Sequence, residues 1–518
     1  MVRAALDDSQ KMQVDAPASH HFQRWLLPVT LVILLLGIGV SVYLVRNWPF
    51  TEKNVVKQLQ QATSSTVHIS AFERVFFPRP GCIAQGVSFE KGSDPHDQVK
   101  LTVDKLIIEG TLTGLFSKHL ASIRLLGAHA FFPEFGTGPQ WKPTTSDVVV
   151  DELIANSSLL EFARRDPKGP KVQFAIDEFV AHHLATHDPM KFELRLHNPT
   201  PPGEVRATGT FGPWNMDSVS ATPVAGNYSF SNADLGAFEG IHGILGSNGQ
   251  FHGTIENIEV NGATTTPDFQ VKGSTHQIPL ETNFEAMVDS KNGDVTLQQV
   301  QARVLRTIVV SHGSVAGRPG EHGKITSLDM SVRGGRIQDL LLLFVSEKHS
   351  PLSGVVSLKA KTVVPPGDRP FLRKLRMEGD FGIDSALFTK EETQGKLEKL
   401  SEAARGQADQ TDDPDSVVSD LQGHVVVRDG IATFTNIRFL VPGAQAHMEG
   451  TFDQITQKVN LRGLLLMDAN LPKATTGIKS FLLKAVDPFL KKNRHGGARI
   501  PVSITGTYQH PSYHADPV

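Results

Sequence analysis

The alternation of apolar and polar positions in this chain is mainly that of β-strands. Apolar residues occupy every second position in residues 191–197, and charged residues or histidine fill the positions between them. The same period of two recurs in residues 281–290 and 458–471. It predicts antiparallel strands with one dry face and one wet face. The apolar positions selected in this way are Phe192, Leu194, Leu196, Phe284, Val288, Leu461, Leu465 and Met467.

These one-sided strands outnumber the helices that could cover them, and two arrangements satisfy the pattern. Pairs of sheets can close on each other as sandwiches, or one curved sheet can leave its apolar face lining a groove suited to acyl chains. The alternation is the same in both cases. The alternation cannot choose between them. General physical considerations favour the sandwich slightly, in which the eight residues named above would form sealed cores.

Glycines recur two positions before an aromatic or β-branched residue. A glycine inside a strand permits a bulge or a bend, which predicts curvature of a long sheet; ordinary turns explain such glycines equally well. The six cases begin at Gly209, Gly226, Gly253, Gly379, Gly450 and Gly506.

A few segments have the composition of helices. The pattern predicts helices over residues 51–61, 151–165, 336–348, 390–407 and 471–492. The segment 151–165 begins with acidic residues and ends with basic ones, as the helix dipole favours. The segment 471–492 is basic and amphipathic. It predicts a helix that caps the sheet or, alternatively, one that contacts a membrane or a partner.

The N-terminal region contains a different signal. The 21 residues 25–45 carry no charge and are bracketed by Arg24 and Arg46. This length spans a hydrocarbon core of about 30 Å as a helix. No small-residue cleavage site follows, so we predict an uncleaved transmembrane anchor over residues 25–46 with a short tail, 1–24, before it. The anchor residues include Trp25, Leu34, Leu35, Leu36, Tyr43 and Val45.

Charge and cysteine content narrow the chemistry. Lys and Arg number 51 against 54 Asp and Glu, a net charge of −3 with neutral His, so no nucleic-acid partner is expected. Cys82 is the single cysteine, which excludes an internal disulfide; we expect it to be a small buried apolar residue.

The histidines of residues 181–187 are the nearest approach to a metal motif. On a helix His183 and His187 would share a face, but the preceding alternation predicts a strand, where they would lie about 13 Å apart. The sequence also lacks a nucleophile elbow, a phosphate-binding loop and a zinc-protease motif. We therefore expect no metal, no cofactor and no enzymatic activity.

Several segments resemble the AsmA-like family of envelope proteins, relatives of TamB and of the bridge-like lipid-transfer proteins. The resemblance follows a short tail and one N-terminal span, and it is closest in the C-terminal region and the terminal strand. The segments that carry it are residues 68–89, 264–273, 352–367, 421–453 and 497–511.

The resemblance implies a mainly β fold with a few helices, in which a long curved antiparallel sheet forms a groove behind one N-terminal transmembrane helix. It implies an N-terminal region over residues 51–350 and a C-terminal region over 351–518. It also implies a single-pass protein of the bacterial inner membrane with its bulk in the periplasm. The expected function is binding of phospholipid or another acyl-chain lipid, in transport to the outer membrane or in its homeostasis. The alternative is a non-catalytic envelope scaffold or assembly factor that carries no lipid and holds an envelope protein partner.

Overall fold

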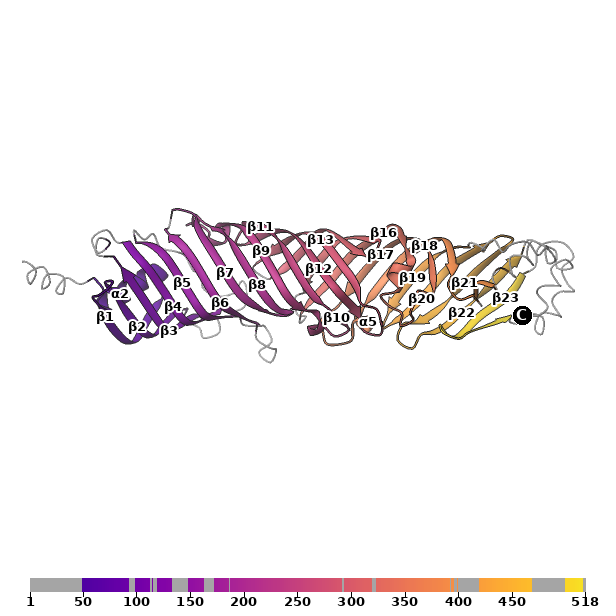
Figure 1. Ribbon diagram of the computed structural model, residues 1–518, viewed down its shortest axis with the longest axis horizontal. Helices are drawn as coiled ribbons and strands as arrows, with labels where there is room; N and C mark the ends of the chain where they lie inside the picture. Colours follow the sequence, from indigo (N-terminus) through magenta and orange to yellow (C-terminus); the bar gives the residue numbers. More distant parts are fainter. Residues whose placement is uncertain are drawn as a thin grey trace, which may run out of the picture. The chain divides into compact units, whose positions relative to one another are not determined.

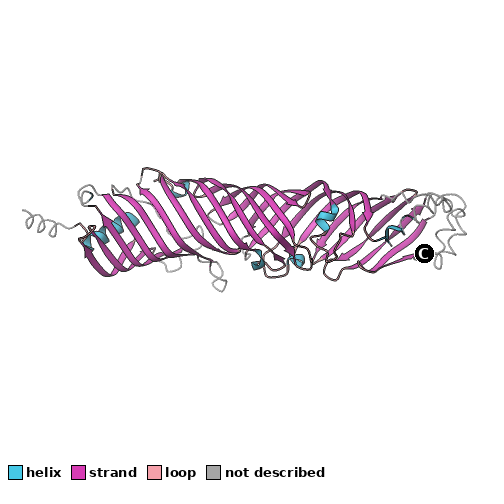
Figure 2. Ribbon diagram, viewed as in Figure 1, coloured by secondary structure: helices cyan, strands magenta, loops and turns pink. Residues whose placement is uncertain are grey.

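A single curved, open sheet dominates the computed structural model (Figures 1 and 2). The structure describes residues 49–92, 98–111, 114, 119–132, 148–162, 172–185, 187–290, 293–318, 323–391, 393–395, 398, 419–467 and 499–515. Within these ranges 24 strands belong to the sheet. The chain divides into two compact units, Met1–Val55 and Val56–Val518, and the 24 described strands lie in the second.

The strands follow one another closely along the chain. Those of the first half are β1 (Thr66–Val75), β2 (Gly81–Lys91), β3 (Val99–Gly110), β4 (His119–Phe132), β5 (Val149–Phe162), β6 (Val172–Leu184), β7 (Met190–Pro199), β8 (Pro202–Phe211), β9 (Pro223–Asp234), β10 (Ile241–His242), β11 (Ile244–Thr254) and β12 (Asn257–Val271). Those of the second half are β13 (Ile278–Asp289), β14 (Asp294–Val304), β15 (Thr307–Gly317), β16 (Lys324–Arg336), β17 (Leu352–Val364), β18 (Arg376–Phe388), β19 (Ser419–Arg428), β20 (Ile431–Val441), β21 (Ala444–Asp453), β22 (Lys458–Met467), β23 (Arg499–Thr507) and β24 (Pro511–Ala515).

Helices occupy little of the described chain (Figure 2). They include α2 (Glu52–Thr63), η1 (Val219–Ala221), η2 (Leu235–Ala237), α4 (Ile337–Leu341) and α5 (Phe371–Lys374). The helix predicted over residues 51–61 is confirmed as α2. Val55 is its buried residue, and Val56 and Leu59 are half-buried.

Neighbouring strands pair in chain order, and nearly all of them are antiparallel. The exception in direction is β5, which pairs parallel with β4. The two-residue strand β10 pairs with the end of β12, so β9 pairs directly with β11. In the described chain β1 pairs with β2 alone and β24 with β23 alone, so the sheet is open. The predicted boundary at residue 350 falls between β16 and β17, which are hydrogen-bonded neighbours.

Because the strands from β5 onward alternate in direction, their connections alternate between two rims of the sheet. We call rim A the one that holds residues 235–243, 272–277, 305–306, 337–351 and 389–390, which follow β9, β12, β14, β16 and β18. Rim B is the opposite one, with residues 255–256, 365–375, 429–430, 454–457 and 508–510, which follow β11, β17, β19, β21 and β23.

The helix predicted over residues 151–165 is wrong, because residues up to Phe162 form β5. The strand lies between β4 and β6, and this pairing overrides the favourable charge distribution of a helix. Ser157 adopts a left-handed backbone, with φ of 51°, between Ala155 and Ser158, which both face inward. This irregularity breaks the period of two, so the strand is hidden from a search for alternation.

The helix predicted over residues 336–348 is much shorter in the structure, where α4 ends at Leu341. The carbonyl groups that would have continued it accept hydrogen bonds from another part of rim A. Ser274 Oγ donates to the carbonyl oxygen of Leu342 at 2.9 Å, and Thr275 Oγ1 donates to that of Ser346 at 2.9 Å. These tertiary contacts compete with helical hydrogen bonds and end the helix.

Two predicted elements cannot be compared with the structure. The segment 471–492 and the anchor 25–46 lie outside the described residues. Of the helix predicted over 390–407, the described residues 391, 393–395 and 398 are helical, and residues 392, 396, 397 and 399–407 also lie outside. In the described part of the chain, no helix has both the length and the apolar character required to cross a bilayer.

Candidate functional site: an uncharged face of the sheet

The inner face of the sheet carries one continuous row of directly paired residues without a charge. Paired residues on adjacent strands point to the same side of a sheet, so a chain of such pairs traces a single face. Starting from Leu194 on β7, the pairs lead through Ala207 on β8 and Tyr228 on β9. The same rule can be followed to both ends of the described sheet.

We call this set the central row. It has one member on every described strand except β10 and consists of Phe72, Ala84, Leu106, Leu125, Ala155, Phe179, Leu194, Ala207, Tyr228, Gly249, Gly262, Phe284, Val300, Ser311, Met330, Ala360, Gly379, Val425, Phe434, Gly450, Leu461, Ile504 and Tyr513. Its polar atoms are the hydroxyls of one serine and two tyrosines.

Three residues selected by the sequence alternation belong to this row: Leu194, Phe284 and Leu461. Phe192 and Leu196 flank Leu194 on the same face of β7, and their pairs on β8 are Gly209 and Val205. Val288 lies on the inner face of β13, opposite Ile258. Leu465 and Met467 are opposite Ala446 and Ala444 and are buried, at 5% and 3% exposure. The structure thus places all eight residues on one face.

The central row is neither sealed nor fully exposed. Its eight consecutive members from Phe179 on β6 to Val300 on β14 are all half-buried. The core of a closed sandwich would bury large side chains such as Phe179 and Phe284 almost completely. This part of the row therefore remains partly accessible, with apolar side chains as its surface.

Glycines let aromatic rings lie against the backbone of this face. Gly249 on β11 and Gly262 on β12 are directly paired, with Tyr228 and Phe284 on either side of them. A Cβ atom on Gly262 would lie 2.8 Å from Cζ of Phe284, and it would also collide with the hydroxyl of Tyr228. Tyr228 shares a hydrogen bond of 3.1 Å with Ser247 Oγ, and burial raises its pKa.

The predicted role of the recurrent glycines in curvature receives partial support from the backbone. All six lie inside strands. Gly253, Gly450 and Gly506 have φ of 130°, 148° and 97°, in the region that favours glycine. The aromatic residue two positions after a glycine is on the same face, which places Phe381 and Phe452 inward with Gly379 and Gly450.

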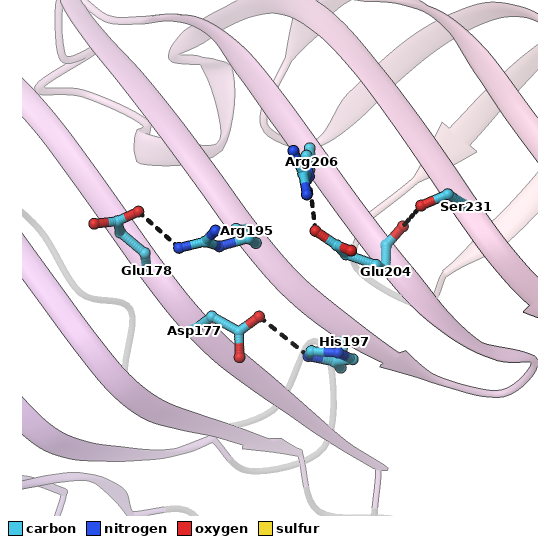
Figure 3. Close-up of polar contacts among 7 residues, drawn as sticks. All are labelled: Asp177, Glu178, Arg195, His197, Glu204, Arg206 and Ser231. Carbon is cyan, nitrogen blue, oxygen red and sulfur yellow. Dashed lines mark hydrogen bonds and ion pairs between the residues drawn. The ribbon is translucent and has the colours of Figure 1, made fainter.

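The outer face is charged, and its ion pairs join adjacent strands or two positions of one strand. Figure 3 shows this arrangement on β6 to β9, where Arg195 reaches Glu178 at 3.1 Å and His197 reaches Asp177 at 3.2 Å. Arg206 binds Glu204 at 2.7 Å, and this hydrogen bond lowers the pKa of the Glu204 carboxyl. Such exposed pairs contribute little to stability, because water screens them, but their charges make this face hydrophilic.

Helix α4 covers the inner face over strands β16 to β18. Ile337, Leu340 and Leu341 pack against a buried cluster that includes Val332, Val356 and Ile383 of β16, β17 and β18. Asp339 of the same helix is buried, and its Oδ2 accepts hydrogen bonds from the backbone N–H of Arg306 and from Thr307 Oγ1, both at 3.0 Å. α4 is therefore held at its place on the inner face.

The histidines of residues 181–187 do not come together as metal ligands in the described part of the chain. His182 and His183 each contact a separate carboxylate, Glu152 at 3.8 Å and Asp188 at 3.6 Å. No group of three or more His, Cys, Asp or Glu residues that could hold a metal occurs among the described residues. Cys82 is buried as expected, at 1% exposure, and burial raises its pKa to about 12.

The sequence alternation identified the character of this face but missed most of its members. Small residues such as Ala207, Gly249 and Ala360 form part of the apolar face in the folded sheet, but in the sequence they do not stand out as apolar positions. Whether they belong to the central row depends on the strand register, which bulges shift at several points.

Comparison with known proteins found no relative of this chain. No protein-family model matches it, and no curated protein or solved structure matches it.

Proposed function

We propose that this protein binds acyl-chain lipid along the central row. The observation that supports the proposal most directly is that the row crosses the described sheet without a charge while eight consecutive members stay half-buried. Apolar surface left in contact with water is costly, at about 25 cal/mol per Å². An acyl chain lying on this face would remove that cost, and the curved sheet would then serve as a groove.

The chemistry of the face favours phospholipid chains over a small polar ligand. The polar groups of the row are the hydroxyls of Tyr228, Ser311 and Tyr513, so the row contains no cation that could form an ion pair with a phosphate or a carboxylate. A phospholipid would therefore keep its headgroup in water at a rim while its chains lie inside. At about 4.8 Å between strands, 22 intervals give a path of roughly 105 Å, long enough for several lipids in line.

The proposed location of the protein and its proposed role in lipid transport rest on the sequence. The uncharged run 25–45 predicts attachment to a membrane. The resemblance to AsmA-like proteins predicts that this is the bacterial inner membrane, with the sheet in the periplasm. On that basis the proposed role is phospholipid transport to the outer membrane, or maintenance of its lipid composition.

Site-specific photo-crosslinking in the full chain tests the proposal. Benzoylphenylalanine replaces Phe192 or Phe284 on the inner face, and matched control variants carry it at Lys191 or Glu285, one residue away on the outer face. After irradiation in a Gram-negative host, the purified protein is examined for covalent phospholipid by mass spectrometry. We expect adducts at Phe192 and Phe284 and none above background at the controls. Equal labelling at inner and outer positions, or folded protein without adducts, would refute lipid binding and favour the scaffold function.

A further inference from the structure

The two rims of the sheet touch each other at two places. Since rim A and rim B lie at opposite ends of the strands, a contact between them means that the sheet has curved until its mouth is bridged. We call these contacts the first seam and the second seam. Each joins residues that are distant in sequence.

The first seam joins α5 on rim B to the connection after β9 on rim A (Figure 1). The backbone N–H of Phe371 donates to the carbonyl oxygen of Glu239 at 3.1 Å. Gly240 lies so close that a Cβ atom on it would be 2.8 Å from Cβ of Phe371. Lys272, also on rim A, braces this site through an ion pair with Glu239 at 2.7 Å and a backbone hydrogen bond to Gly240 at 2.9 Å.

The second seam joins the rim A residues after β16 and β18 to the rim B connections after β21 and β23. Gln457 Nε2 donates to Ser346 Oγ at 3.5 Å in this seam. Lys390 Nζ donates to the carbonyl oxygen of Gln509 at 2.7 Å and lies 5.3 Å from the ring centre of Tyr508. The Tyr508 backbone N–H in turn donates to the carbonyl oxygen of Gln457, 2.8 Å away in the rim B connection after β21. The Lys390–Gln509 contact is exposed to solvent.

The seams are weak compared with the strand ladders beside them. Each is closed by one or two hydrogen bonds, whereas β17 and β18 pair over eleven positions in register. Contacts of this kind, few in number and open to water, are the first to break in local opening of a folded protein. The rims can therefore part at a seam while the strands stay paired.

We infer that the two seams are latches over the groove, and that lipid enters or leaves the part between β10 and β24 when they open. This inference rests on the proposed function, because a latch needs a cargo. With both seams closed, rim contacts lie across the mouth above the central row, so a bound lipid cannot leave sideways at these points. Opening a seam would clear a path for the headgroup along the rim.

Reversible cross-linking of the seams in the full chain tests the inference. Cysteine pairs at Lys390 and Gln509, and separately at Glu239 and Phe371, are joined by a short bifunctional methanethiosulfonate that dithiothreitol removes. The control pair is Arg369 and Asp429, a solvent-exposed ion pair of 2.6 Å that joins two connections of rim B and crosses no mouth. The native Cys82 is buried and stays in place.

The measurement follows a fluorescent phospholipid. The protein, reconstituted in phosphatidylethanolamine–phosphatidylglycerol vesicles, is loaded with nitrobenzoxadiazole-labelled phosphatidylethanolamine before cross-linking. The amount bound is measured first, and then its rate of release to acceptor vesicles. We expect each locked seam to slow release by about tenfold, with recovery after dithiothreitol and no effect of the control pair, as for a lid that gates exchange.

Two results would overturn the inference, and they can be told apart. Normal release from a locked seam in protein that carries bound probe would show that the seams are permanent structural contacts, and lipid binding would stand. Failure of the unlocked protein to hold any probe would refute the proposed function and the latches with it. The second cysteine pair keeps the test decisive if one pair prevents folding, which circular dichroism would show.

Discussion

Replacing Asp339 with alanine should loosen α4 from the inner face of the sheet. Asp339 is 6% exposed, and its carboxylate accepts two hydrogen bonds, from the Arg306 backbone N–H and from Thr307 Oγ1, both at 3.0 Å. Thr307 is itself fully buried. These two bonds join α4 to the connection between β14 and β15, so their loss removes the polar anchor of the helix.

The size of the stability loss depends on which hydrogen bonds Arg306 and Thr307 keep in the variant. The Arg306 N–H loses this part-buried hydrogen bond, and a hydrogen bond to a carboxylate contributes about 1.5–3 kcal/mol. Thr307 Oγ1 still accepts a hydrogen bond from the Arg336 N–H at 2.8 Å and donates to the Arg336 carbonyl oxygen at 3.2 Å. The free energy lost at Thr307 is therefore smaller. Removing a buried carboxylate also relieves its own desolvation. The expected net loss of local stability is about 2 kcal/mol.

Hydrogen exchange followed by mass spectrometry is the suitable assay, because a long sheet of this kind need not unfold in a single two-state step. A loss of about 2 kcal/mol corresponds to roughly 30-fold faster exchange in peptides covering residues 305–307 and 337–341, if they exchange by local opening. Asp339→Asn retains an acceptor oxygen and should change exchange by only a few-fold. Unchanged exchange in Asp339→Ala, or an equal effect of Asp339→Asn, would refute the reasoning.

Three further predictions concern the inner face and Cys82. With a pKa of about 12 against an ordinary 9.0, the Cys82 thiol should react with maleimide at pH 8 roughly a thousandfold more slowly in the native protein than after denaturation; rapid native labelling would contradict its burial. Gly262→Val should destabilise the sheet by about 1–3 kcal/mol, because the new side chain overlaps Phe284 and Tyr228. Gly382→Val, where nothing lies within 4 Å of a Cβ, is its control, and equal denaturation curves for the two would count against close packing at Gly262. Leu194→Asp should lower lipid crosslinking at Phe284 by about tenfold, since the carboxylate would have to be desolvated beside an acyl chain. Lys191→Asp on the outer face should leave it unchanged, and an equal loss in both variants, or loss of the circular dichroism signal, would point to a folding defect.

Some features of the protein follow from local sequence alone. Alternation in residues 191–197 is enough to put Leu194 and Arg195 on opposite faces, because successive side chains of any strand point in opposite directions. The burial of Cys82 and the helix α2 were predicted for similar local reasons. The segment 151–165 shows where local information fails: the left-handed backbone at Ser157 breaks the alternation, and pairing with β4 and β6 outweighs the helical charge pattern.

Other features depend on the whole sheet. Alternation fits a sandwich or a single curved sheet equally well, and strand pairing decided for one sheet, in which Leu194, Phe284 and Leu461 are members of one row. Helix α4 ends at Leu341 because Ser274 and Thr275, far away in sequence, take its next carbonyl groups. The second seam joins Lys390 to Gln509, 119 residues apart. Each strand's period of two determines only which side chains share a face. Register, curvature and rim contacts arise from pairings between distant segments, so only the tertiary structure decides what that face encloses.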